Sequence, residues 1–250
     1  MIDITRRDVE SYVSMRRASG LADATVNREL CCLKNMLSKA VDWNYLETNP
    51  AWGVKQRKEN PGAFDFLRRD ELDRFLSAVT PTWRTFFTLA VYTGMRKGEL
   101  LSLRWENLDL RSGIITVPDS KNGDCRYIPM NTAVRDTIIC HPKRILDGSV
   151  CSYVFSNKDG RPRVDPRTAF RKALELAGIE RNLRIHDLRH TFASILVMEG
   201  VDLRTIANLL GHRDIKMTMR YAHLAPEHLK EAVEKLLVSK GNPEGLRREG

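Results

Sequence analysis

Apolar residues recur at three- and four-residue steps near the start of the chain, and this spacing predicts two helices. Thr5 and Asp8 form a capping-box pattern where the first helix would begin. The second helix has the stronger apolar stripe. It would run from about Thr25 to residues 43–45. The beginning of the chain is therefore expected to be a small helical unit.

Residues 48–64 interrupt the helical pattern. This stretch contains two Asn-Pro pairs, two glycines and a cluster of bases, which is the composition of an exposed hinge or linker. We therefore expect a helical domain over 1–60, a larger domain over 61–240 and a disordered tail over 241–250.

The larger domain is predicted to be helical, except for one region in which the helical spacing of apolar residues is interrupted. Between residues 108 and 130 three short β-rich runs, LDL, GIITV and RYIPM, are joined by turn-forming residues and predict a small antiparallel sheet. Gly94 is a helix stop after a nearly all-apolar, buried helix. The expected fold class is mainly α with a small antiparallel β-sheet (α+β). Helices are expected at 68–79, 81–93, 97–105, 132–140, 166–177, 187–199, 202–210, 214–221 and 226–237.

Composition narrows the class of protein. The 250 residues are 42% apolar and 29% charged, as in globular chains, and neither a membrane span nor a signal peptide is readable. Five scattered cysteines, an odd number, indicate no disulfide framework and fit a reducing cytoplasm. A net charge of +9 would attract a polyanion such as nucleic acid, although many basic proteins bind none.

Metal and nucleotide sites are not predicted. His186 and His190 lie four apart on one helical face, but Asp187 replaces the glutamate of a zinc helix and Arg189 lies between them. The chain contains no GxSxG and no Walker pattern. We therefore expect no metal and no cofactor.

Cations in apolar or turn surroundings are the remaining signal. They occur in TGMRKGE, DSKNGDCRYIP, HDLRH and LLGH, and MRYAH follows with a tyrosine; the residues concerned are Arg96, Lys121, His186, Arg189, His212 and Tyr221. Their order and spacing resemble those of the tyrosine recombinase, or phage integrase, family from about residue 60 to 237. Two guanidinium groups suit a phosphodiester under attack, because they hold its non-bridging oxygens without deprotonating.

The resemblance implies a role for each residue. Tyr221 would attack the scissile phosphate, giving a 3′-phosphotyrosyl enzyme and a free 5′-hydroxyl, and Arg96 and Arg189 would hold the phosphate. Lys121 would protonate the leaving oxygen, although a neighbour such as Arg126 is an alternative. His186 would assist acid–base transfer, His212 would hydrogen-bond the phosphate and His190 would support them. Taken singly, each has a structural explanation, such as a surface ion pair for Arg96 or a core aromatic for Tyr221.

The family also implies partners. The expected reaction is strand exchange between two DNA duplexes through a Holliday junction, carried out by four protomers. We expect it to take place in the cytoplasm, and we expect no membrane partner. The helical unit over 1–60 resembles part of the family's core-binding domain, and residues 24–37 carry the motif. The first helix of that domain is expected to be absent, for one of three reasons: the chain was trimmed, its start was placed downstream of the true one, or it is naturally short. The helix over 226–237 would dock on a neighbouring protomer. A DNA-facing surface is expected at Arg161, Arg163, Arg167, Arg171 and Lys172.

Two other functions stay open. A DNA-binding regulator or inactive remnant would bind DNA in a salt-sensitive way and form no covalent adduct. A type IB topoisomerase would use the same nucleophile but relax DNA as a monomer.

Overall fold

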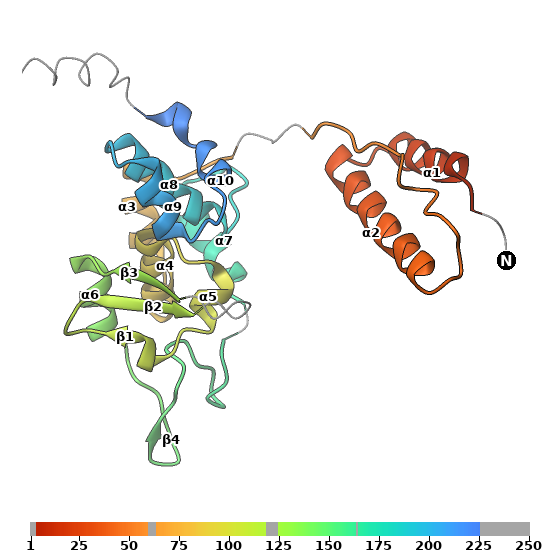
Figure 1. Ribbon diagram of the computed structural model, residues 1–250. Coiled ribbons are helices and arrows are strands. Elements are labelled where there is room, and N and C mark those ends of the chain that lie inside the picture. Colours follow the sequence, from red (N-terminus) through yellow and green to blue (C-terminus); the bar gives the residue numbers. More distant parts are fainter. Residues whose placement is uncertain (1–3, 60–63, 119–124, 164, 226–250) are drawn as a thin grey trace, which may run out of the picture. The chain divides into compact units, whose positions relative to one another are not determined.

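The computed structural model describes residues 4–59, 64–118, 125–163 and 165–225 of the chain (Figure 1). The chain consists of two compact units, residues 1–63 (unit 1) and residues 64–250 (unit 2), and each is described by itself. Lys121, the helix expected over 226–237 and the tail over 241–250 lie outside the described residues.

Unit 1 is an antiparallel pair of helices, α1 (Arg6–Ala18) and α2 (Asp23–Asp42). The predicted capping box is confirmed: the Asp8 carboxylate accepts from the Thr5 backbone N–H at 2.8 Å, and Thr5 Oγ1 accepts from the Asp8 N–H at 3.4 Å. A bidentate ion pair between Arg16 and Glu29 joins the two helices. Apolar side chains of both helices form a small core, which includes Val9, Leu30 and Leu37.

The expectation of an exposed linker is in part wrong. Ala51 and Val54 are buried in the core of unit 1, because two helices alone leave its apolar faces uncovered. The buried Asn27 amide donates to the Arg57 carbonyl and accepts from the Arg57 N–H. Residues up to at least 57 therefore belong to the folded unit, and sequence composition alone does not reveal this.

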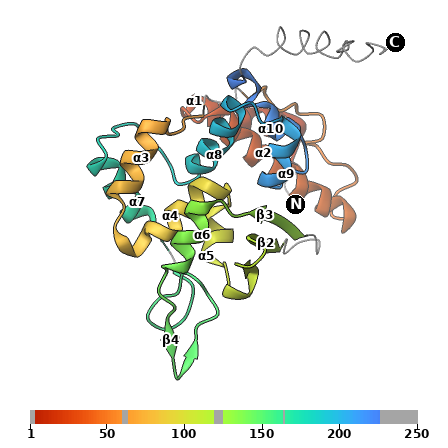
Figure 2. The same cartoon turned by 90° about the vertical axis from the view of Figure 1, so that its left-hand side faces the viewer.

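Unit 2 is built around α4 (Pro81–Thr93), which is buried on almost every side. Phe86 and Phe87 of α4 pack edge to face with each other and with aromatic rings of neighbouring elements. Figure 2 shows α3 (Arg69–Ala78) beside α7 (Arg167–Leu176). The other helices of the body are α5 (Lys97–Leu101), α6 (Thr132–Ile139), α8 (Asp187–Met198) and α9 (Leu203–Leu210).

One antiparallel sheet has the order β1-β2-β3 and consists of β1 (Leu108–Asp109), β2 (Ile114–Pro118) and β3 (Cys125–Pro129). Ile115 pairs with Ile128, and both are buried against the helical body. The last pair, Pro118 with Cys125, flanks the segment that contains Lys121. The fold class expected from the sequence is confirmed.

Two details differ from the expected elements. The sequence pattern missed the small hairpin β4 (Ile145–Leu146) and β5 (Ser149–Val150), which stands away from the rest of unit 2 (Figures 1 and 2). The helix expected over 214–221 is instead the single turn α10 (Lys216–Met219), followed by the 3₁₀ turn η2 (Ala222–Leu224). A 3₁₀ turn also follows α5, η1 (Trp105–Asn107). Tyr221 lies between α10 and η2.

Within the described residues, no helix is long and apolar enough to cross a membrane. The five cysteines are free thiols, and the described part of the chain holds no group of three or more potential metal ligands.

Candidate active site

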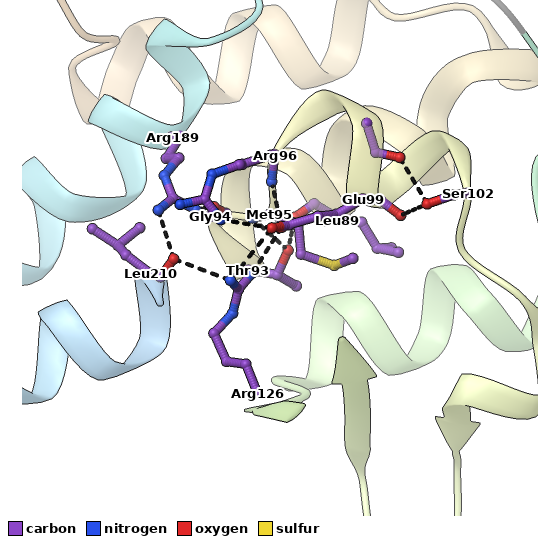
Figure 3. A network of polar contacts seen from close by, with 11 residues as sticks. Leu89, Thr93, Gly94, Met95, Arg96, Glu99, Ser102, Arg126, Arg189 and Leu210 are labelled. Carbon is purple, nitrogen blue, oxygen red and sulfur yellow. Dashed lines mark hydrogen bonds and ion pairs between the residues drawn. The ribbon is translucent and has the colours of Figure 1, made fainter. Parts of the chain in front are cut away.

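Arg189 is buried inside α8, with 4% of its surface exposed. Its Nη1 donates to the Gly94 carbonyl at 2.6 Å and its Nη2 to the Leu210 carbonyl at 2.6 Å (Figure 3). Gly94 ends α4 in the left-handed conformation and Leu210 ends α9, so both carbonyls lack the partner that a continuing helix would supply. The predicted HxxR arginine thus joins the ends of two helices to a third.

Arg96 lies at the N-terminal cap of α5, where Glu99 folds back on it. The Glu99 carboxylate accepts from the Arg96 backbone N–H at 2.8 Å and from its Nη1 at 2.7 Å. Arg126 approaches the same carboxylate from β3, with Nη2 2.8 Å from Oε2, and its Nη1 donates to the Leu210 carbonyl at 3.1 Å. In Figure 3 the three arginines gather around Glu99 and Leu210.

Glu99 is a site residue that was not predicted from the sequence. A glutamate three residues after Arg96 was a readable capping-box signal at the start of α5. Arg126 was considered only as a substitute for Lys121. The structure shows it as the bridge between α5, the sheet and the end of α9.

The site carries surplus positive charge. Three guanidinium groups face one carboxylate, which leaves two positive charges in excess. Burial, followed by the charges of Arg96 and Arg126, lowers the pKa of Arg189 to about 10, so the group stays protonated at neutral pH. Burial raises the pKa of Glu99, but Arg126 and Arg96 outweigh this and the net pKa is lowered. Such a cluster is suited to an anion with several oxygens.

Tyr221 is 1% exposed, and its hydroxyl lies 2.6 Å from Nδ1 of His190. Burial, and then the neighbouring His186, lowers the pKa of His190 to about 4. Burial also raises the pKa of Tyr221. Both side chains are therefore neutral at pH 7, a state in which the imidazole can accept the proton of the phenol.

Phe64 covers this pair. Its ring stacks on His190 with 5.1 Å between centroids and meets the edge of Tyr221 at 5.0 Å. The guanidinium of Arg220 lies over the ring of Phe64, 5.5 Å from the ring centroid. Phe64 was expected to be part of the linker, and nothing in the local sequence pattern indicated its contact with Tyr221.

His212 follows Gly211 at the end of α9 and is half-buried. Its Nδ1 lies 2.8 Å from the hydroxyl of Thr218. Burial, then the charges of Arg189, Arg96 and Arg126, lowers the pKa of His212 to about 4. Gly211 has φ +66°, and a Cβ there would lie 2.5 Å from Nη1 of Arg126, so the glycine of the LGH motif makes room for the arginine cluster.

His186, in contrast, is exposed. Its ring stands edge-on to His190 at 5.3 Å, and partial burial of the ring, then the charge of Arg189, lowers its pKa. The predicted acid–base histidine thus contacts the ring of His190 and feels the charges of Arg189 and Arg96, whereas His190, predicted as supporting, contacts the tyrosine hydroxyl.

The residues expected to face DNA fall into two groups. Arg163 is half-buried: its Nε donates to the Ser156 carbonyl, and its guanidinium lies 5.1 Å from the centroid of Trp83. Its guanidinium is thus held by the fold. The other four side chains are exposed, with Arg167 paired to Asp165: Arg161, Arg167, Arg171 and Lys172.

The chain is similar to a protein family and to several known proteins. The model of the Phage integrase family matches residues 65–228. The Shufflon-specific DNA recombinase of Escherichia coli is 32% identical over 90% of this chain, which spans 59% of that protein. Tyrosine recombinase XerC of Lactobacillus leichmannii is 29% identical over 90% of this chain and 80% of its own length. The fold is similar to that of the Tn1549 transposon integrase, solved with a circular intermediate DNA, with a TM-score of 0.73, 21% identity and coverage of 94% of this chain and 86% of that one.

Proposed function

The chain belongs to the phage integrase family, and on this premise we propose that it is a site-specific recombinase that breaks and rejoins double-stranded DNA through a phosphotyrosine. The observation that carries the proposal is the arrangement of Tyr221. Its hydroxyl contacts a neutral imidazole in the same compact unit in which three guanidinium groups form a cationic cluster. The relatives named above as recombinases support the same reaction class.

The phosphate would be held by cations. Arg189 is fixed by two carbonyls and Arg96 by Glu99, so little side-chain entropy is lost when they bind the scissile phosphate. His212, neutral and half-buried, would donate a further hydrogen bond. These donors would stabilise the negative charge that gathers on the non-bridging oxygens in the transition state.

The nucleophile would be activated within the pair. As the Tyr221 oxygen bonds to phosphorus, its proton passes to Nδ1 of His190, and the bond from phosphorus to the 5′-oxygen breaks. Lys121 is proposed, from the family resemblance, to give its proton to that leaving oxygen. The attack requires the hydroxyl to be uncovered, since Phe64 and His190 enclose it in the free chain. Attack by another 5′-hydroxyl reverses each step and returns the proton to Tyr221.

Strand exchange between two duplexes would proceed through a Holliday junction with four protomers, in the cytoplasm. The segment 226–237 is proposed to dock on a neighbouring protomer. The sequence of that segment has apolar residues at helical spacing, Leu229, Val233, Leu236 and Leu237. An apolar pocket of about 270 Å³ opens between α4, β3, α8 and α9 and offers a place for such residues of a neighbouring protomer; its lining includes Tyr92, Ile128, Phe192, Leu196 and Leu209. DNA contacts are proposed at the exposed bases Arg161, Arg167, Arg171 and Lys172.

The test is capture of covalent protein–DNA adducts from a library of randomised nicked duplexes, followed by sequencing of the captured DNA. We expect adducts from the natural chain and none from Tyr221→Phe, which should still bind DNA. Adducts that persist in Tyr221→Phe would place the nucleophile elsewhere. Salt-sensitive binding without any adduct would favour a DNA-binding regulator, and relaxation of supercoiled DNA without strand exchange would favour a topoisomerase.

A further inference from the structure

Thr218 is a residue for which the reaction described above has no role. It lies on α10, is fully buried, and its hydroxyl is 2.8 Å from Nδ1 of His212. Its backbone carbonyl accepts from the Tyr221 N–H at 3.0 Å. One residue therefore contacts both the histidine of the LGH motif and the backbone of the tyrosine.

Among the residues that the structure describes, the Thr218 hydroxyl has one acceptor for its proton, Nδ1 of His212. A threonine in a helix often donates to the carbonyl four residues earlier, as Thr191 does to Asp187 at 2.9 Å. Thr218 makes no such bond within the described part of the chain, and being fully buried it does not reach solvent. A buried hydroxyl without an acceptor is costly, so the hydroxyl donates to Nδ1 of His212.

That direction decides where His212 carries its proton. Arg189 from α8, Arg96 from the start of α5 and Arg126 from β3 all disfavour a charged ring, as does His190 from α8, and burial does so most strongly. A neutral imidazole holds one proton, and if Nδ1 accepts, the proton is on Nε2. Only this tautomer presents an N–H donor to an anion on the side of the ring away from Thr218.

We propose that Thr218 is a positioning residue whose hydroxyl holds His212 in the Nε2–H tautomer and in the orientation needed to donate to the scissile phosphate. The inference rests on the proposed function for the identity of the anion, but the hydrogen bond itself exists without DNA. Thr218 also links His212 to Tyr221, since its backbone carbonyl accepts a hydrogen bond from the Tyr221 N–H.

Three substitutions separate the hydroxyl from the shape of the side chain. Thr218→Val keeps the branched volume and removes the donor, whereas Thr218→Ser keeps the donor and removes one methyl group. Thr132→Val, at an exposed position of α6, controls for the same chemical change outside the site.

The first measurement is ¹⁵N NMR of the free full-length chain labelled in its six histidines, with His212 identified by its loss in His212→Gln. The natural chain, Thr218→Ser and Thr132→Val should show a pyrrole-type Nε2 and a pyridine-type Nδ1, and Thr218→Val should show both tautomers. A pyrrole-type Nδ1 in the natural chain would overturn the proposal, and so would an unchanged single tautomer in Thr218→Val. The result for the natural chain does not depend on the folding of any variant.

The second measurement is the single-turnover rate of covalent adduct formation on a site taken from the library selection. Thr218→Val should cleave about tenfold more slowly than the natural chain at equal DNA affinity, which is the effect of one hydrogen bond. Thr218→Ser, which keeps the hydroxyl, should cleave at the rate of the natural chain. Equal rates for Thr218→Val and the natural chain would refute the role of Thr218. Absence of adducts in the natural chain would instead refute the proposed function, while the NMR result would still decide the tautomer.

Discussion

The bridge between Arg126 and Glu99 allows a quantitative prediction about unit 2. Arg126→Met removes two hydrogen bonds to the Glu99 carboxylate and one to the Leu210 carbonyl, while an unbranched apolar side chain keeps much of the volume. Glu99→Gln keeps the shape of its side chain and removes the negative charge. The two variants and their combination form a double-mutant cycle.

The structure sets the size of the effect. The side chains of Arg126 and Glu99 are 13% and 19% exposed, so solvent screens their interaction poorly. A buried charge left entirely alone costs about 3–5 kcal/mol. After Arg126→Met, Glu99 keeps two bonds from Arg96, and we expect a loss of about 2–3 kcal/mol in the free energy of unfolding. The double variant should be less destabilised than the sum of the single ones by about 1.5 kcal/mol or more.

The assay is urea unfolding followed by the fluorescence of Trp83 and Trp105, the half-buried tryptophans of unit 2. Arg69→Met is the matched control, since Arg69 and its partner Glu199 are 66% and 56% exposed, and its stability should be unchanged. Strictly additive losses in the cycle would refute the reasoning, because they would mean that Arg126 and Glu99 do not stabilise each other.

Three further outcomes follow from the site and its surface. Lowering the pH from 6.5 to 4 should reduce the free energy of unfolding, because the unfolded chain takes up a proton that His190, with its pKa lowered to about 4, resists in the folded chain; urea titrations should show a weaker pH dependence for His190→Gln, and an equal dependence would contradict this. Arg171→Ala should reduce the slope of log affinity for DNA against log salt concentration by about 1. Arg163→Ala should leave that slope unchanged, because the Arg163 guanidinium is already held by contacts within the fold. Filter binding at several salt concentrations compares the two variants, and equal slopes would be evidence against a DNA contact at Arg171. Lys121→Ala should slow cleavage much less on DNA with a 5′-bridging phosphorothiolate, a good leaving group, than on ordinary DNA; equal slowing on both substrates would remove its proposed role as the acid.

The sequence predicted the helices and the sheet well where burial leaves a mark on the choice of residues. The apolar stripe of α2 reflects the burial of one face, and the nearly all-apolar α4 reflects burial on almost every side. Strands of two residues, as in β4 and β5, are too short to show a period. Ala51 and Val54 were missed for a related reason: irregular backbone between prolines and glycines has no period in which a buried position stands out.

The residues of the candidate site likewise fall into those that the sequence predicted and those that it did not. Motif order singled out Arg96, Arg189, His212 and Tyr221, and the structure brings these residues into one unit together with Glu99 and Arg126. The role of Arg126 depends on β3 and the end of α9 meeting in space, and no local pattern carries that information. For the same reason the sequence did not indicate that His190, expected only as a supporting residue, contacts the tyrosine hydroxyl, since that contact depends on the packing of Tyr221 against α8.

Phe64 has a practical consequence for dissecting the protein. The family match begins at residue 65, which makes that residue the natural place to cut when the catalytic unit is to be produced by itself. Such a cut removes the ring that stacks on His190 and meets the edge of Tyr221. A fragment that begins at residue 65 would report the reactivity of an unshielded tyrosine, and a fragment that retains Phe64 would report that of the shielded one. The two fragments differ by a single residue at the end of the chain, and comparing their adduct yields isolates the contribution of this one side chain.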